Sequence, residues 1–488
     1  MNCCPPEQGG PLLPFRFFIL KVLKILMTKA FAALLLIVPC LALSAPPSPE
    51  QRAQGKVRTT SKSQKVSKPL KAPLVPVALK ASKAPPKFLA KNPVQVKERV
   101  QPLQNLQPAR LTVPSKSSAP GDGAEARLIE IYKLIVQAKM SEALPKAKTL
   151  VDDHPNFQLA QLVYGDLLTA TSRPLLNFGD VPDSVAHLAG PMLKDLRHES
   201  QLRLQALRER PAPGTVPSQF LALSRRTKHA IAIDASRSRL YLFENTVVGL
   251  TLLADYYISV GKAGTEKNIE GDLRTPLGVY FISGNLNPSS LREFYGSGAL
   301  PLNYPNQLDL KRGKTGSGIW LHGTPPAQFS RPPLATDGCV VLANPDLERV
   351  IKTVEVRTTP VVISQSLKWV APKEAKANSK LFAEAFEAWQ QAKSSTDVSR
   401  VIAWYTPDFT SYGKTLAEWK PTLETERKQV AKQGVRRKYI SYLHWTDSDE
   451  TMVVTFDEIA NNVKTGRTKR QYWTHQANQW KIFFEGII

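Results

Sequence analysis

The sequence predicts a multidomain protein with an α-helical N-terminal hairpin region, a β-rich sandwich in the middle and an α+β cone at the C-terminal end. Three observations support this order. Apolar residues recur with a helical period from residue 124 and with a period of two from residue 229, and helical patterns precede strand patterns after residue 380. The 488 residues leave room for two or three domains with cores of their own.

Residues 1–44 are typical of a secretory signal peptide. Lysines precede an apolar run over residues 30–43, and small residues follow it. Met27 is an alternative start, because the residues before it add little that a signal needs. We therefore expect a periplasmic protein, exported by this signal. An uncleaved membrane anchor that includes the upstream apolar residues is the alternative.

Residues 45–121 are rich in lysine and proline, and their basic residues exceed their acidic ones by thirteen. Such a segment buries too little apolar surface to fold, so we expect a disordered basic tether. In an exported chain its partners would be anionic cell-wall polymers or a membrane surface. Phe88 is the only aromatic residue of the segment, so the basic residues lack the interleaved aromatics of nucleic-acid binders, and nucleic acid is not expected. A solvated spacer without a partner is the alternative.

Residues 122–225 carry apolar stripes of helical period, followed by a further predicted helix over residues 183–210. The spacing of Tyr132, Ala147 and Pro155 resembles one tetratricopeptide-type helical hairpin. One such unit cannot bury its apolar face alone. We therefore expect it to pack on the neighbouring domain or to form a homodimer.

Residues 228–366 contain short strands with period-two alternation, such as "HAIAID", "RLYLF" and "GVYFIS", separated by turn residues. They predict the β-rich sandwich. Residues 367–379 are predicted to be a linker. Residues 380–488 begin with helices and end with strands, and resemble the nuclear-transport-factor-2-like cone. We expect this cone to bind or position a ligand and not to be a second active site. Asp457 and Tyr472 are strand residues that are candidates to face a pocket in its interior, and packing in the core is the preferred alternative.

Cys339 is the only cysteine beyond residue 40, so it has no disulfide partner in an exported chain. A thiol attacks a carbonyl carbon only when a base removes its proton, and an imidazole such as that of His322 performs this step. Backbone N–H groups at the Gly338–Cys339 turn are candidates for an oxyanion hole. A packing thiol and a core histidine are the alternatives for the two residues. No clustered metal ligands accompany Cys339, so neither a metal nor a cofactor is expected.

Together these residues resemble the signature of the L,D-transpeptidase catalytic domain, in which His-Gly is followed by [Ser/Thr]-x-Gly-Cys. Here the two halves are "HGT" at residues 322–324 and "TDGC" at residues 336–339, and "EGDLRTPLGVYFI" and "LPLNYPN" also resemble that family. The resemblance implies a cysteine nucleophile, Cys339, and a histidine base, His322. The oxyanion or substrate-binding candidates are Gly323, Thr324, Thr336, Asp337 and Gly338.

The chain departs from the family at two positions. Asp337 stands where many members have histidine, and Val341 stands where an arginine is often found. A carboxylate beside a thiolate raises the thiol pKa in a dry pocket, unless it points away or contacts a substrate amine. The missing arginine leaves the recognition of the donor peptide without an assigned residue.

The resemblance implies an exported enzyme that forms an acyl-enzyme on peptidoglycan stem peptides and passes the acyl group to an amine, as an L,D-transpeptidase does. The order of domains is similar to that of L,D-carboxypeptidases that set helical cell shape, in which water is the acceptor. An inactive cell-wall-binding scaffold is the second alternative. An amine acceptor needs a groove beside the thiol, and the expected flanks of this groove are residues 304–312 and 325–333.

Overall fold

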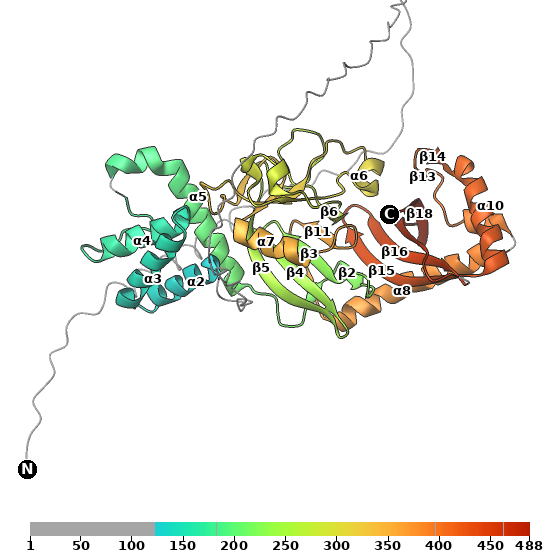
Figure 1. Ribbon diagram of the computed structural model, residues 1–488, viewed down its shortest axis with the longest axis horizontal. Helices are drawn as coiled ribbons and strands as arrows, with labels where there is room; N and C mark the ends of the chain where they lie inside the picture. Colours follow the sequence, from blue (N-terminus) through green and yellow to red (C-terminus); the bar gives the residue numbers. More distant parts are fainter. Residues whose placement is uncertain (1–122, 182, 396, 462) are drawn as a thin grey trace, which may run out of the picture. The chain divides into compact units, whose positions relative to one another are not determined.

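The structure is a computed structural model, shown in Figure 1, and it describes residues 123–488 except residues 182, 396 and 462. The predicted signal peptide, the alternative start at Met27 and the basic tether lie outside the described residues. Within the described part of the chain, each helix is too short or too polar to cross a membrane.

The N-terminal region is helical, as predicted. Its helices are α2 (Ala124–Val136), α3 (Met140–Asp153), α4 (Gln158–Ala170) and α5 (Asp183–Arg208). The core between them is formed by the predicted apolar stripes, and Phe329 and Ala343 from the following domain join the same cluster. The helices therefore pack on the neighbouring domain, which is one of the two expected outcomes. The homodimer stays a prediction.

The middle domain is built on one curled, mixed sheet. The strand order is β6-β11-β3-β4-β5-β10-β8-β7, and β9 pairs with β5. The strands are β3 (His229–Asp234), β4 (Arg239–Thr246), β5 (Gly249–Gly261), β6 (Gly278–Phe281), β7 (Ala299–Pro301), β8 (Trp320–His322), β9 (Leu334–Thr336), β10 (Val340–Leu342) and β11 (Pro360–Ser364). The helical elements are η1 (Pro288–Ser290), η2 (Glu293–Tyr295), α6 (Gln307–Lys311) and α7 (Asn344–Thr353). The β-rich class is confirmed, with one sheet in place of two stacked sheets.

Both faces of this sheet are covered. Successive side chains of a strand point to opposite faces, so Ile231 and Ile233 of β3 enter one core while Ala230 and Ala232 enter another. The second core also contains apolar residues from strands of the C-terminal domain, among them Leu443. The two domains therefore share a hydrophobic core.

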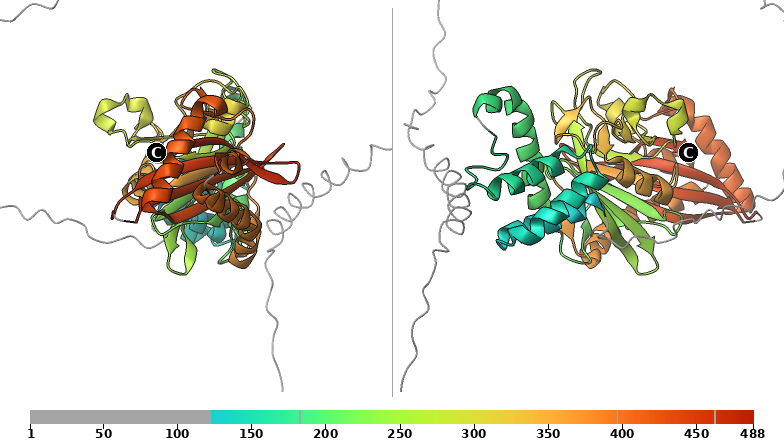
Figure 2. Two further views of the ribbon diagram at one scale, coloured as in Figure 1. Left: turned by 90° about the vertical axis from the view of Figure 1, so that its right-hand side faces the viewer. Right: turned by 60° about the vertical axis from the view of Figure 1, so that its left-hand side comes forward.

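The C-terminal domain has the predicted cone of helices and antiparallel strands (Figures 1 and 2). Its helices are α8 (Pro372–Ser394), α9 (Val398–Ile402) and α10 (Leu416–Gln433). Its strands are β13 (Thr410–Ser411), β14 (Lys414–Thr415), β15 (Val435–Thr446), β16 (Glu450–Ala460), β17 (Arg467–Gln476) and β18 (Gln479–Ile487). Aromatic residues of α8 at helical spacing, including Phe382, Phe386 and Trp389, pack against the concave side of the sheet.

Two predicted boundaries are wrong. The expected linker, residues 367–379, contains β12 (Trp369–Val370) and the first turns of α8. Its alanine- and lysine-rich sequence favours a helix, and Pro372 is tolerated in the first helical turn. The helical region also ends in two strands, β1 (Val216–Pro217) and β2 (Phe220–Ala222). β1 pairs with β12 and β2 pairs with β15, so both segments are held by backbone hydrogen bonds to strands that follow later in the chain.

Candidate active site

Two neighbouring strands position Cys339 and His322. His322 is the last residue of β8, and Cys339 directly precedes β10. The two strands run parallel, with Val340 opposite Leu321 and Val341 opposite His322. Both residues line one cavity of about 350 Å³, together with Lys267, Glu270, Gly271, Phe294, Tyr295, Gly316, Ser317, Gly318, Ile319, Arg331, Thr336 and Asp337.

His322 is oriented as a base. Its Nδ1 lies 2.8 Å from the carbonyl oxygen of Gly323. A carbonyl only accepts, so Nδ1 carries the proton of the neutral ring and Nε2 keeps its lone pair. The ring is only 2 % exposed, and burial lowers its pKa to about 4. The imidazole is therefore neutral at pH 7 and able to accept a proton.

Cys339 carries a thiol in the resting site. Its Sγ lies 3.4 Å from the carbonyl oxygen of Gly318. Burial raises the pKa of the thiol, and the carboxylate of Asp337 adds to this, whereas a hydrogen bond from the Trp320 backbone opposes it. The thiol is therefore mainly protonated at pH 7, and a thiol in this state becomes a nucleophile only when a base removes its proton.

The turn before Cys339 is fixed by Thr336 and Gly338. The Thr336 hydroxyl accepts from the N–H of Gly338 at 3.1 Å and donates to the carbonyl of Cys339 at 2.7 Å. Gly338 has a φ of +126°, and a Cβ at this position would lie 2.8 Å from the carbonyl oxygen of Arg274. Glycine is therefore required here. In this structure the N–H of Gly338, expected in the oxyanion hole, is engaged within the turn.

Gly323 and Thr324 lie behind His322 and do not line the cavity. The Asn344 side chain accepts from the N–H groups of Thr324 at 3.1 Å and Ser297 at 2.9 Å, and it donates to the carbonyl of Thr324 at 2.8 Å. A Cβ on Gly323 would collide with Asn344 Oδ1. Because Gly323 has no side chain, Asn344 can approach closely and connect the end of β8 to the loop after η2 by hydrogen bonds. Sequence reasoning missed Asn344, because an asparagine at a helix start is typical of an ordinary cap.

Asp337 lies at the edge of the cavity and is exposed. Its carboxylate pairs with Lys262 at a distance of 2.8 Å, and both side chains are open to solvent. Burial of the thiol outweighs Asp337 among the causes of the raised Cys339 pKa. Asp337, which replaces the usual histidine, therefore pairs with Lys262 and affects the pKa of the thiol less than burial does.

Arg331 is a charged residue of the cavity that sequence reasoning did not single out. It lies on the loop between the two halves of the motif, within the flank predicted over residues 325–333. Its guanidinium carbon lies 4.4 Å from the centre of the Phe294 ring. The other predicted flank, residues 304–312, does not line this cavity, and its part in an acceptor groove stays a prediction. The only sequence signal for Arg331 is its basic charge within "FSRPPLAT".

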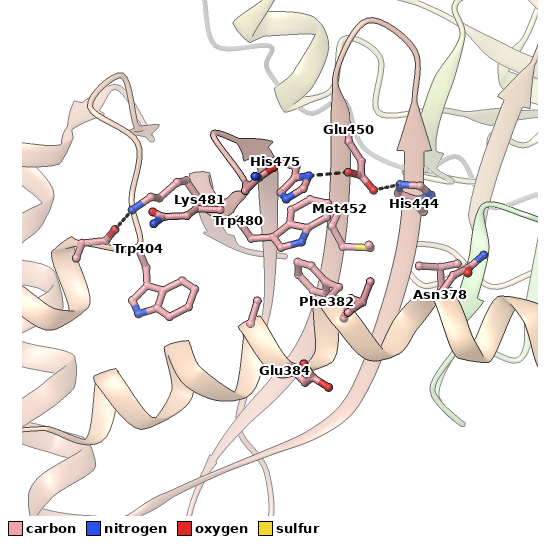
Figure 3. A pocket seen from close by; sticks show the side chains of 16 residues that line it. Asn378, Phe382, Glu384, Trp404, His444, Glu450, Met452, His475, Trp480 and Lys481 are labelled. Atoms are coloured by element: carbon pink, nitrogen blue, oxygen red, sulfur yellow. Dashed lines mark hydrogen bonds and ion pairs between the residues drawn. The ribbon is translucent and has the colours of Figure 1, made fainter.

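A second cavity, of about 850 Å³, opens on the C-terminal domain (Figure 3). Glu450 accepts hydrogen bonds from Nε2 of His444 at 3.0 Å and from Nδ1 of His475 at 2.8 Å. The ring of Trp480 stacks on His475 at 4.8 Å, and Phe382 contributes to the apolar wall. An aromatic face beside a polar cluster is suited to binding an amphipathic ligand.

The inward-facing residues predicted for the cone do not line this cavity. Asp457 is paired with Arg226 at 2.8 Å, and Tyr472 belongs to the core shared with the middle domain. The next residue on β17, Trp473, enters the core of the cone instead. Alternation along the strand therefore places Tyr472 on the outer face of the cone.

Comparison with known proteins supports both resemblances. Residues 228–363 match the family of the L,D-transpeptidase catalytic domain (YkuD), and residues 381–486 match the Cds6 C-terminal NTF2-like domain. No curated protein matches the chain.

Among solved structures, the chain is similar to Bd1075 of Bdellovibrio bacteriovorus, with 22% identity and a TM-score of 0.47 over 56% of this chain and 98% of that chain. It is also similar to the helical cell shape determining protein Pgp2 of Campylobacter jejuni, with 20% identity and a TM-score of 0.45 over 60% of this chain and 99% of that one.

Proposed function

We propose that this chain is a cysteine acyl-transfer enzyme acting on peptidoglycan stem peptides. One observation carries the proposal: within a segment that matches the L,D-transpeptidase catalytic domain, parallel pairing of β8 and β10 brings Cys339 and a neutral, correctly protonated His322 to one cavity. The family implies a peptidoglycan stem peptide as substrate. The residue roles assigned to this chain are part of the proposal.

In the proposed reaction, His322 Nε2 takes the thiol proton while Cys339 Sγ attacks the carbonyl carbon of the bond between an L-centre and D-alanine. The C–N bond then breaks, and the imidazolium returns the proton to the departing amine, which leaves as D-alanine. A thioester remains on Cys339. An amine or a water molecule attacks this thioester, loses a proton to His322 and restores the thiol.

The acceptor separates two candidate functions. An L,D-transpeptidase admits an amine from a second stem, whereas an L,D-carboxypeptidase admits water. One flank expected to form the acceptor groove is instead held by the C-terminal domain, since Lys311 pairs with Asp408 and Arg312 pairs with Asp447. This observation favours the L,D-carboxypeptidase, with a role in cell shape, as the second candidate function.

The deciding experiment incubates the purified protein with disaccharide-tetrapeptide and follows the products by mass spectrometry. We expect release of D-alanine that is abolished in Cys339→Ala and His322→Asn. A crosslinked dimer would identify the transpeptidase, and tripeptide alone at high acceptor concentration would identify the carboxypeptidase. D-Alanine release by Cys339→Ala at the wild-type rate would contradict the proposal.

An inactive cell-wall-binding scaffold predicts no D-alanine release at all. Alkylation of the thiol is a poor substitute for this measurement, because a thiol with a raised pKa reacts slowly with iodoacetamide even in a working enzyme. Product analysis therefore decides between the enzyme and the scaffold.

We also propose that the C-terminal cavity binds part of the cell-wall polymer and positions the enzyme on it. The aromatic face of Trp480 and the neighbouring polar cluster support this role. Trp480→Ala should weaken binding to isolated sacculi while turnover of a small soluble muropeptide stays at the wild-type rate. Unchanged binding to sacculi would contradict this role.

The periplasm is the proposed location of the reaction, because residues 1–44 have the pattern of a secretory signal. Cell fractionation and the mass of the mature N-terminus test this. A protein that retains residues 1–44 in the cytoplasm would contradict the proposed location.

A further inference from the structure

Arg331 is a buried cation with no acidic partner in the described part of the chain. It is 9 % exposed, and its Nε has no hydrogen-bond partner. Burial lowers the pKa of its guanidinium, against the opposing effects of Asp337 and Cys339. A buried charge without a counter-charge is costly, so such a group is expected where a ligand supplies the opposite charge.

The charges around the cavity single out Arg331. Lys267, the other lining cation of the described chain, is paired with Asp272 at 2.8 Å. Asp337 is already paired with Lys262. Glu270 is an exposed acid at the cavity and belongs to no ion pair with Arg331. Among the described residues, Arg331 is therefore the lining cation that remains available to an anion.

The position of Arg331 would place such an anion near His322 and Cys339. The Phe294 ring is near both Arg331 and His322: the guanidinium carbon lies 4.4 Å and the His322 ring 5.9 Å from its centre. An anion bound by Arg331 therefore lies close to the base and the thiol. A guanidinium also presents paired N–H donors that match the two oxygens of a carboxylate.

We propose that Arg331 receives the free C-terminal carboxylate of the stem peptide and so restricts the site to uncapped terminal residues. This inference rests on the proposed function and deepens it. It assigns a residue to donor recognition in a chain where Val341 occupies the position at which related sequences often have an arginine.

The helical region positions the loop that carries Arg331. Asn156 Nδ2 donates to the carbonyl of Pro326 at 2.8 Å, and the rings of Phe157 and Phe329 stack at 4.3 Å. These contacts hold the part of the loop that precedes Arg331 against the connection between α3 and α4.

Two further contacts hold the loop beside Arg331 itself. Ser330 donates to the buried carboxylate of Glu199 at 2.8 Å, and Tyr257 donates to the carbonyl of Arg331 at 2.9 Å. The guanidinium of Arg203 covers the Tyr257 ring at 3.9 Å and also donates to Glu199. Residues of α5 and β5 therefore hold the loop beside Arg331.

The experiment compares a tetrapeptide stem that has a free C-terminal carboxylate with the same stem as a C-terminal amide. Turnover is measured with the active enzyme, and binding of both ligands is measured by calorimetry on Cys339→Ala. We expect wild type to prefer the acid by roughly 10- to 100-fold, the range for hydrogen bonds to a charged group. Arg331→Gln should bring this ratio to about one, and Arg331→Lys should restore part of it.

Arg292→Gln is the matched control, because Arg292 is exposed, lies two residues from Phe294 and does not line the cavity. It should keep the wild-type preference. A folded Arg331→Gln variant that keeps the preference would overturn the inference, as would a wild type that binds acid and amide equally. Absence of turnover would instead count against the proposed function, and the binding ratio would still test Arg331.

Discussion

The helical region and the C-terminal domain both pack on the catalytic domain, but they hold different parts of it. The helical region contacts the loop that carries Arg331, through pairs such as Phe157–Phe329 and Glu199–Ser330. The C-terminal domain contacts α6 and the opposite face of the sheet, for example through Arg312 and Asp447. The first interface therefore contacts a loop that lines the candidate active site, whereas the second contacts α6 and the sheet and belongs to a domain with its own cavity.

The largest expected effect comes from a matched pair of phenylalanines, one at each interface. Phe329 is 7 % exposed and packs on the helical region, and Phe483 is 3 % exposed and packs in the core shared with the C-terminal domain. Each change to alanine should cost about 3–5 kcal/mol in the free energy of unfolding, because it leaves a cavity in a packed core. Denaturant unfolding measures this cost.

Only the Phe329→Ala change should also alter substrate selection. Loss of the stack on Phe157 frees the loop, so the preference for the acid over the amide substrate should fall while the Phe483→Ala variant keeps it. Equal loss of preference in both variants would show that the two interfaces do not differ in the way described.

The sequence was sufficient to identify Cys339 and His322 as the candidate nucleophile and base, but insufficient to single out Arg331 beside them. Cys339 and His322 belong to local motifs whose spacing is visible in the chain, and the strand patterns around them have a period of two. Arg331 becomes significant only through burial, which depends on contacts such as that between Asn156 and Pro326, 170 residues apart. A contact between residues so far apart in the chain leaves no local pattern in the sequence.

The same limit explains the errors in the fold. β2 is a short apolar segment after the helical region, and its pairing with β15 joins residues that are more than 200 positions apart in the sequence. The predicted linker has a composition that suits a helix, and Pro372 is tolerated in the first turn of α8. In both places, tertiary pairing determined the boundary.

A smaller effect is expected in the acid limb of the pH profile. In the proposed reaction neutral His322 is the active form, so kcat/KM should be lost as the pH falls through its pKa of about 4. Burial is the main cause of this low pKa, and the positive charge of Arg331 contributes in the same direction. Arg331→Gln should therefore raise the pKa of His322 and move the acid limb to higher pH.

Arg312→Gln is the control for this shift, because it removes the same charge at the C-terminal interface. Its acid limb should coincide with that of wild type when kcat/KM is measured with the amide substrate, which does not depend on a carboxylate at Arg331. A shift of the limb to lower pH in Arg331→Gln would contradict the sign of the interaction.

The smallest expected effect comes from removing one polar contact at each interface. Ser330→Ala removes a donor to the buried carboxylate of Glu199, and Arg312→Gln removes an ion pair that is partly open to solvent. Both changes should cost about 1 kcal/mol or less in unfolding free energy, since Glu199 keeps its bonds from Arg203 and exposed ion pairs contribute little. Stability alone will therefore not distinguish the two variants.

The acid-to-amide ratio will distinguish them, because Ser330 is the neighbour of Arg331. Loss of its hydroxyl lets the guanidinium move relative to the thiol. We expect a decrease of a few fold for Ser330→Ala and none for Arg312→Gln. An unchanged ratio in Ser330→Ala, with Phe329→Ala still affected, would limit the positioning role to the aromatic stack.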